Sequence, residues 1–257
     1  AANQSNAGSS GVTFNNKGFS LSTDTANAFN NYYTTDSYVS WTFRKAAKFF
    51  DVVTYTGNGI GSQYLNHSLG VIPGMIIIKS TSTTGQWNVG HRSTGNVNGV
   101  LDTTAYFQYN NGINMDNSTT TQFHVAYYGS TGPNISGVSY VAYVFAHDAG
   151  VDGMVQCGTF TADGSGLASV TLGWEPQYLL FKPSSAVGSW LCADSARGMA
   201  VGPASQILVP NNANAEGASG TVKVSATGAS FGGLAASYTY IYLAIRRPKL
   251  PQLAKRG

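Results

Sequence analysis

Two stretches of this chain are copies of each other: LGVIPGMIIIK at 69–79 and LGWEPQYLLFK at 172–182. They are offset by 103 residues, and the same offset joins GQW, which ends at Trp87, to GSW, which ends at Trp190. In each copy a proline precedes an apolar run that is short enough for a strand and is typical of a strand buried on both faces. The sequence therefore predicts a tandem module whose central strand is repeated.

A second repeated element lies near the end of each copy. YVAYVFAHD at 140–148 returns as YIYLAIRRP at 240–248, and a related stretch, YVSWTFRK, occurs upstream at 38–45. A period of roughly 100 residues is the size of a small domain, whereas solenoid repeats of about 20 to 50 residues cannot bury a core alone. We therefore predict two and a half copies of one module in line. The predicted divisions are the C-terminal half of a preceding β module at 1–50, a first full module at 51–150, a second at 151–250 and a tail at 251–257.

The composition predicts an all-β fold. Only 10% of the 257 residues are charged, while 31 are Gly and 15 are Tyr, a balance that favours short strands and tight turns. Strands are expected at 52–55 and 154–160, each followed by a glycine-rich turn, GNGIG at 57–61 and ADGSG at 162–166. Roughly eight strands per module, with turn signals every 8 to 12 residues or so, are typical of a β-sandwich. We predict jelly-roll-like sandwich modules of about 100 residues each.

Three finer predictions concern how the copies correspond. Trp87 and Trp190 each follow a glycine turn and begin a hairpin strand, and we expect each indole to pack on the core of its own module. The closing strands are expected to match as FHVAYYG at 123–129 and VKVSATG at 222–228. Before the first full module, GFSLS and YVSWTFRK are expected to be closing strands only. Their partners would come from upstream residues, from another subunit or from a differently built fold.

Charge and hydropathy limit the classes of partner. The net charge of +3 comes largely from basic residues at 246–256, which is a weak indication of nucleic-acid binding, so we expect no nucleic-acid partner. No stretch has the roughly 18 to 20 consecutive apolar residues of a membrane helix, and AANQSNAGSS at 1–10 lacks the parts of a signal peptide. Because the chain also lacks an initiator Met, we interpret it as a portion of a longer protein.

Cys157 and Cys192 both lie in the second module. Two cysteines are conceivable as a disulfide, but they do not make the cysteine framework of a small secreted protein. Buried cysteine often behaves as a small hydrophobic residue. We expect two buried free thiols.

The repeated stretches carry a resemblance. SWTFRKAAKFFDVVTYTGNG at 40–59, the two Leu-Gly-x-x-Pro copies and the two aromatic closing strands are similar to an uncharacterised repeat family in structural proteins of marine tailed phages. The resemblance covers about residues 38 to 248. It implies a tail-fibre or virion structural protein in which the module follows a lectin-like jelly-roll domain. It implies no catalytic residue.

Catalytic and metal chemistry has little support in the sequence. None of His67, His91, His124 and His147 stands with a second ligand at zinc spacing, and we expect structural or surface roles for them. Asp194 and Ser195 could join a distant histidine, but no nucleophile-elbow motif accompanies them. GNGIG lacks the lysine and the helix of a phosphate loop. We therefore expect no enzyme, no cofactor and no metal site.

A glycan-binding site is the one binding site that the sequence suggests. Aromatic side chains stack on sugar rings and neighbouring amides and carboxylates bond their hydroxyls. Such residues gather in the stretch that differs most between the copies, where loops face solvent or partners. The candidates are Tyr106, Tyr109, Asn110, Asn111 and Asp116. The alternative is that alternate aromatic residues of this stretch belong to the core.

These observations lead to one expected function and two alternatives. We expect a non-enzymatic virion protein on the exterior of a tailed phage, a tail-fibre or tail-appendage component that takes part in host-surface attachment. Its expected partners are copies of itself in a homotrimer, other virion proteins and a host-surface glycan, with no membrane insertion. The first alternative is a capsid decoration protein that cements neighbouring subunits, and the second is a tail enzyme that degrades surface polysaccharide.

Overall fold

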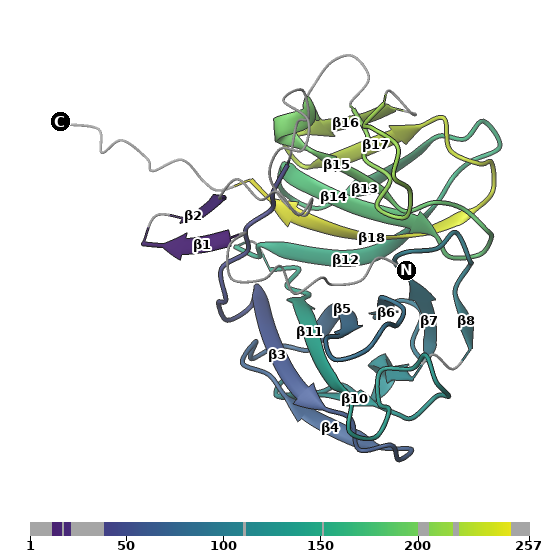
Figure 1. The fold of residues 1–257 in the computed structure, drawn as a ribbon. Helices are drawn as coiled ribbons and strands as arrows, with labels where there is room; N and C mark the ends of the chain where they lie inside the picture. The colour runs from purple at the N-terminus through teal and green to yellow at the C-terminus, as the bar shows by residue number, and fades with distance from the viewer. Residues whose placement is uncertain are drawn as a thin grey trace. The chain divides into compact units, whose positions relative to one another are not determined.

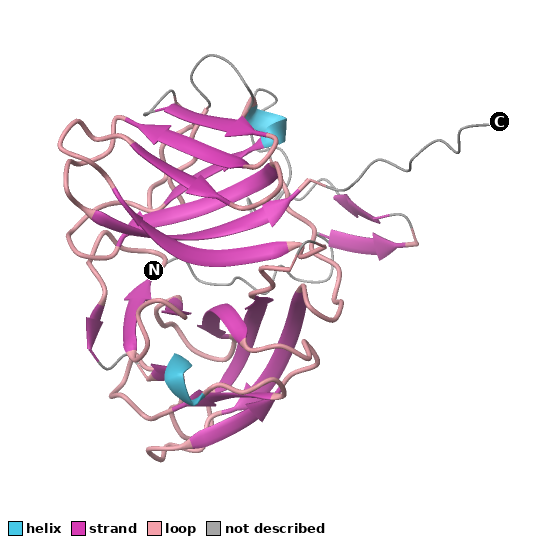
Figure 2. Cartoon of the chain, turned by 180° about the vertical axis from the view of Figure 1, so that it is seen from behind, coloured by secondary structure: helices cyan, strands magenta, loops and turns pink. Residues whose placement is uncertain are grey.

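The computed structural model of this chain describes residues 12–16, 18–21, 39–109, 112–150, 152–199, 206–217 and 221–247. Strands dominate these residues, and the helical segments among them are two single 3-10 turns, η1 (Met115–Asn117) and η2 (Ser195–Arg197) (Figure 2). Every ladder between two named strands is antiparallel. The predicted all-β, sandwich-type fold is therefore confirmed.

The chain divides into two compact units, Ala1–Phe43 and Arg44–Gly257. In the first unit, β1 (Val12–Asn15) and β2 (Gly18–Leu21) pair as a hairpin, so GFSLS does form a strand over 18–21. Residues 39–45 form no strand, and the strand that we predicted at YVSWTFRK is wrong over these residues. The related stretch of the first module is a strand because neighbours on both sides satisfy its backbone groups, and no described strand pairs with 39–45.

The first module consists of two antiparallel sheets (Figure 1). The larger sheet has the order β3-β11-β5-β6-β7-β8, and the smaller has the order β4-β10-β9. Its strands are β3 (Phe50–Thr56), β4 (Gln63–Asn66), β5 (Pro73–Ser80), β6 (Asn88–His91), β7 (Val97–Val100), β8 (Gln108–Tyr109), β9 (Ile113–Asn114), β10 (Gln122–Val125) and β11 (Ser139–Ala146). Between the sheets lies an apolar core that includes Ile76, Ile78 and Phe123.

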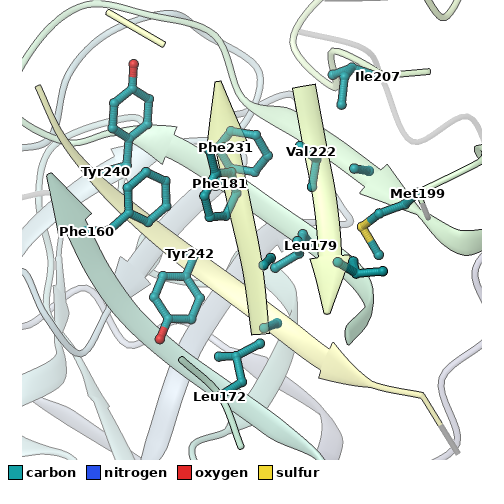
Figure 3. Packing of buried hydrophobic residues seen from close by; sticks show 14 of the residues in the cluster. Phe160, Leu172, Leu179, Phe181, Met199, Ile207, Val222, Phe231, Tyr240 and Tyr242 are labelled. Atoms are coloured by element: carbon teal, nitrogen blue, oxygen red, sulfur yellow. The ribbon is translucent and has the colours of Figure 1, made fainter. Parts of the chain in front are cut away.

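The second module repeats this plan with sheets β12-β18-β14-β15 and β13-β17-β16 (Figure 1). Its strands are β12 (Val155–Thr161), β13 (Ala168–Thr171), β14 (Pro176–Pro183), β15 (Leu191–Asp194), β16 (Thr221–Ser225), β17 (Gly228–Gly232) and β18 (Thr239–Arg246). Aromatic rings from both sheets meet in its core (Figure 3). Phe160 lies with its ring centroid 4.4 Å from that of Phe231 and 5.2 Å from that of Tyr240.

Strand pairing corrects one of the correspondences that we predicted from sequence. β10 is the central strand of its sheet and pairs with β4, and the central strand that pairs with β13 is β17. Phe123 on β10 therefore corresponds to Phe231, not to a residue of VKVSATG, which is the neighbouring strand β16 and its turn. The prediction failed because β10 and β16 both alternate polar and apolar residues, and alternation alone does not identify a strand's neighbours.

The prolines act as predicted. Pro73 begins β5 and Pro176 begins β14, and in both modules the ladder to the aromatic closing strand is irregular at that point. A proline has no backbone N–H to give to a ladder, so it is tolerated at the first residue of a strand or at a bulge. The shared irregularity fixes the register of each central strand at the same place.

The strands β5 and β6 of the larger sheet are covered on both faces, whereas the edge strand β3 exposes Val52. All eight residues of β5 and all four of β6 are buried, although only alternate residues point into the sandwich core. The second module supplies the outer cover. The imidazole Nε2 of His91 lies 3.1 Å from the carbonyl oxygen of Tyr242, and the backbone N–H of Cys157 donates to Nδ1 of His147 over 3.1 Å. The apolar run predicted to be buried on both faces is confirmed for β5.

Trp190 also lies in the interface between the modules. We predicted that its indole packs on the core of its own module. Its side chain is fully buried, but its indole N–H donates to the carbonyl oxygen of Val100 in the first module over 2.9 Å, and its ring lies 6.1 Å from that of Phe107. The ammonium of Lys182 donates to the backbone carbonyl oxygen of Thr104, which also lies in the first module, over 3.2 Å. The indole thus packs across the two modules and not on the core of its own module alone.

Candidate functional site

The residues predicted to bind a glycan lie around β8 and η1. The ring of Tyr106 is exposed just before β8, and Tyr109 is the last residue of β8, where its backbone pairs with Val97. Asn110 and Asn111 lie outside the described residues. The structure therefore describes one exposed aromatic ring of this set.

Asp116 completes the predicted set and lies in η1 with an exposed side chain. Its Oδ2 lies 2.7 Å from the place that a Cβ on Gly95 would occupy, so the carboxylate is beside that glycine. Gly95 comes two residues before Val97, the ladder partner of Tyr109. The backbones of Asp116 and Tyr109 are thus brought to one region, and the glycan role of the set stays a prediction.

Three of the four histidines, His67, His91 and His147, lie within hydrogen-bond distance of backbone atoms. Nε2 of His67 lies 3.2 Å from the carbonyl oxygen of Thr119, and its Nδ1 accepts from the N–H of Leu69 over 3.2 Å. Burial lowers the pKa of His67 below its ordinary value. Burial also lowers the pKa of His91, to about 4, so this interface imidazole is neutral at pH 7. Within the described residues no three metal-ligating side chains gather.

The other side chains discussed from sequence have local structural contacts. The Asp194 carboxylate caps η2 by accepting from the backbone N–H groups of Ala196 and Arg197, and it pairs with the Arg197 guanidinium. Cys157 and Cys192 are free and buried, as predicted. Burial raises the pKa of both thiols.

A different set of side chains forms a second exposed surface of the first module. It lies on the outer face of the small sheet β4-β10-β9, on the side opposite the core residues Leu65 and Phe123. We call it the outer face. Its members alternate along the strands with the core residues and are Ser62, Tyr64, Asn66, Asn114, Gln122 and His124.

Tyr64, His124 and Ser62 form the centre of the outer face. Tyr64 and His124 are partners in the β4-β10 ladder, and their ring centroids lie 4.8 Å apart at an interplanar angle of 57°. Ser62 Oγ lies 3.0 Å from His124 Nε2. The Tyr64 ring is 51% exposed, whereas His124 is only 5% exposed. The imidazole is thus a support, and the tyrosine ring is the part offered to solvent.

Amide groups continue the outer face on both sides of this centre. Gln122 Nε2 donates to Asn66 Oδ1 across the ladder over 2.9 Å, so both planar amides are held in one orientation. Asn114, opposite His124 on β9, accepts from the backbone N–H of Asn117. Each amide keeps further donor and acceptor positions, because a side-chain amide offers two donor hydrogens and a carbonyl with two lone pairs.

The outer face is uncharged. None of its six members is Asp, Glu, Lys or Arg, and burial lowers the pKa of His124 below its ordinary value, so that imidazole is neutral at pH 7. Nδ1 of His124 is buried and has no hydrogen-bond partner among the described residues. Such an atom is uncommon in folded proteins, because a buried polar atom without a partner costs about 1 to 3 kcal/mol.

The second module has the same backbone at this place with different side chains. The shared register aligns Tyr64 with Leu167 and His124 with Gly232. The pair Asn66 and Gln122 is replaced by Ser169 and Ser230, which are likewise ladder partners. The next strand adds a cation, because Lys223 on β16 is exposed opposite Ser230. The aromatic and amide character of the outer face thus belongs to the first module alone.

Sequence reasoning missed the outer face because it is made by pairing two strands that are 56 residues apart. The alternation in SQYLN at 62–66 and QFHV at 122–125 does indicate two-faced strands. It does not give the register that sets Tyr64 opposite His124. Tyr64 also lies outside the stretch that differs most between the two copies, which is where we looked for a binding site.

The fold and the outer face define an all-β protein of two sandwich modules in contact, one of which carries a neutral aromatic and amide surface. The chain belongs to the family DUF7483, a domain of unknown function, whose model matches residues 1–247. No curated protein and no solved structure matches the chain. Among the described residues, no helix is long and apolar enough to cross a membrane.

Proposed function

We propose that this protein is a non-enzymatic structural component of a tailed-phage virion, a tail-fibre or tail-appendage protein that takes part in attachment to the host surface. The observation that supports the proposal most is the interface between the modules. Strand β5 is buried on both faces, and Trp190 and His91 bond across to the other module. A packed and hydrogen-bonded interface of this kind resists separation of the modules, which suits a protein that transmits force.

Two further observations support the proposal. The resemblance of the repeated stretches is to tailed-phage structural proteins, which gives the proposed location on the virion exterior. The chain also exposes apolar side chains at Val39 and Trp41, which are 44% and 40% exposed. Exposed apolar area of this kind is available for association with copies of the same chain or with other virion proteins. A homotrimer is the assembly that we propose.

The first test is the mass of the purified chain in solution, measured by light scattering at two concentrations. A mass of three chains at both concentrations supports the fibre proposal. A monomer at both concentrations contradicts an autonomous fibre and favours a capsid decoration protein. The second test is immunogold labelling of purified phage particles with antibodies against this chain. Label on the tail supports the proposal, label on the capsid favours the decoration protein, and unlabelled particles refute a virion role.

A further inference from the structure

The outer face of the first module is an exposed surface to which nothing assigns a role. We propose that it is a binding platform for a neutral glycan, with the Tyr64 ring as the stacking surface and the Asn66 and Gln122 amides as hydrogen-bonding groups. The inference deepens the proposed attachment function, on which it rests, by naming the class of ligand and the residues that hold it. It concerns a site different from the one that the sequence suggested around Tyr106 and Asp116.

The first step of the argument concerns Tyr64. Half of this residue is in water, whereas the next residue along β4, Leu65, is buried. The Tyr64 ring packs against the His124 ring, and Nε2 of His124 lies within hydrogen-bond distance of Ser62 Oγ. A sugar ring presents C–H groups on one face and needs a flat apolar surface that is already in place. A tyrosine ring offers such a surface at low conformational cost, because it has only two rotatable side-chain bonds.

The second step concerns the polar groups beside the ring. The hydrogen bond between Gln122 and Asn66 uses one donor and one acceptor and fixes the planes of both amides. The unused amide donors and acceptors match hydroxyl groups, each of which both donates and accepts. Because the amides and the Tyr64 ring alternate with core residues on two neighbouring strands, they share one face of the sheet.

The third step concerns charge. The six members of the outer face carry no formal charge at pH 7, since burial keeps His124 neutral. A surface for phosphate, sulfate or carboxylate groups requires cations, and a surface for basic partners requires carboxylates. Neutral hydroxyls are the ligand groups that fit.

The fourth step is the comparison with the second module. At the same positions that module has Leu167, Ser169, Ser230 and Gly232, and the backbone pairing is unchanged. The sandwich can thus be built without the tyrosine, the imidazole and the two amides. Their joint presence on one module is what a binding site predicts, and a structural requirement of the fold would place them on both.

The second module also supplies the matched control. Leu167 is 53% exposed at the position that corresponds to Tyr64, so Leu167→Ala removes a similar exposed side chain from the wrong module. Both variants should fold, because each changes a half-exposed residue on a sheet surface. Circular dichroism and thermal unfolding of the two variants check this. Tyr64→Phe keeps the ring and tests whether stacking, rather than the hydroxyl, is what matters.

The experiment measures binding of the full chain to a printed array of neutral and anionic glycans. Affinity electrophoresis then follows in gels that contain dextran, mannan or laminarin as neutral probes and alginate as the anionic probe. We expect binding to at least one neutral glycan, a loss of about tenfold or more in Tyr64→Ala, a smaller loss in Tyr64→Phe and unchanged binding in Leu167→Ala. Gln122→Ala should weaken binding in the same direction.

Three outcomes overturn the inference: no binding to any neutral glycan, binding to anionic glycans alone, or equal losses in Tyr64→Ala and Leu167→Ala. Retained binding in Tyr64→Ala with a loss in Asp116→Ala would move the site to the region of η1 and equally refute it. The proposed virion role fails separately, on unlabelled phage particles. A chain that labels the tail and binds no neutral glycan would keep that role and lose this site.

Discussion

Replacing Trp190 by alanine tests whether the contact between the modules is a major source of stability. A buried tryptophan hides about 200 Å² of surface, which at about 25 cal/mol per Å² gives an upper estimate of about 5 kcal/mol. Measured Trp→Ala changes in protein cores cost about 3 to 5 kcal/mol. Because the Trp190 side chain is fully buried and its N–H is bonded to Val100, we expect a loss of about 4 kcal/mol in the free energy of unfolding.

Two further variants separate the contributions to this loss. Trp190→Phe keeps most of the ring but leaves the Val100 oxygen without its indole donor, so we expect a loss of about 1 to 2 kcal/mol. Trp87→Ala is the matched control in the other module. Trp87 is only half-buried, with its ring 6.3 Å from that of Tyr143, and its loss should cost about 1 to 2 kcal/mol.

The assay is equilibrium unfolding in urea, followed by circular dichroism, for the wild type and the three variants. The order of stability should be wild type, then Trp190→Phe and Trp87→Ala, then Trp190→Ala. If Trp190→Ala lowers the free energy of unfolding no more than Trp87→Ala does, or by less than about 1 kcal/mol, the Trp190 side chain is not a major source of the stability of the interface. The two modules would then not stabilise each other through Trp190.

Three further predictions follow from buried groups. The pKa of His91 is about 4 in the folded chain against an ordinary 6.5, so the unfolded chain binds the proton first as pH falls. The free energy of unfolding should fall by up to about 3 kcal/mol between pH 6.5 and 4, and His91→Gln should flatten this slope in urea unfolding. Burial lowers the pKa of Lys182 from 10.5 to about 8, so the folded lysine releases its proton before the unfolded one. The free energy of unfolding should therefore rise between pH 8 and 10.5, and in Lys182→Met the rise should shrink; an equal rise in both proteins would contradict the lowered pKa. Cys157 and Cys192 should react with a thiol reagent only after unfolding, because both are buried and burial raises both pKa values; rapid labelling of the native chain would contradict this.

The sequence was sufficient for the elements whose signal is local. The Leu-Gly-x-x-Pro copies and the apolar runs after them predicted β5 and β14, and the glycine turns at 57–61 and 162–166 predicted where β3 and β12 end. These features depend on a proline without an N–H and on glycines with positive φ, such as Gly59 and Gly166. Both requirements are properties of single residues, and a sequence displays them directly.

The features that the sequence could not predict depend on which strands pair or pack against each other. The register that joins Tyr64 to His124 and the indole of Trp190 to Val100 is fixed by packing between segments distant in the chain. The tryptophan prediction shows the limit well. Trp87 and Trp190 have the same residue type, the same preceding turn and the same following strand, yet Trp190 is fully buried against the other module and Trp87 is not.

The two copies also separate what the module requires from what one copy has added. Lys79 and Lys182 are both buried, and each donates to the carbonyl oxygen of the glycine six residues later, Gly85 or Gly188. A lysine is costly to bury unless its ammonium is bonded, so its presence in both copies at one place shows that the hairpin turn depends on this contact. In the second copy the Lys182 ammonium also donates to the backbone carbonyl oxygen of Thr104 in the first module.

The outer face behaves in the opposite way. Tyr64 and His124 occupy positions where the other copy has Leu167 and Gly232, and the ladder is the same in both. The fold therefore does not require an aromatic ring or an imidazole there. Solvent does not favour them either, because a half-exposed ring and a buried nitrogen without a partner both cost free energy. The glycan platform that we propose accounts for side chains that neither folding nor solvation explains, and the neutral, planar chemistry of this face makes a glycan the ligand to test first.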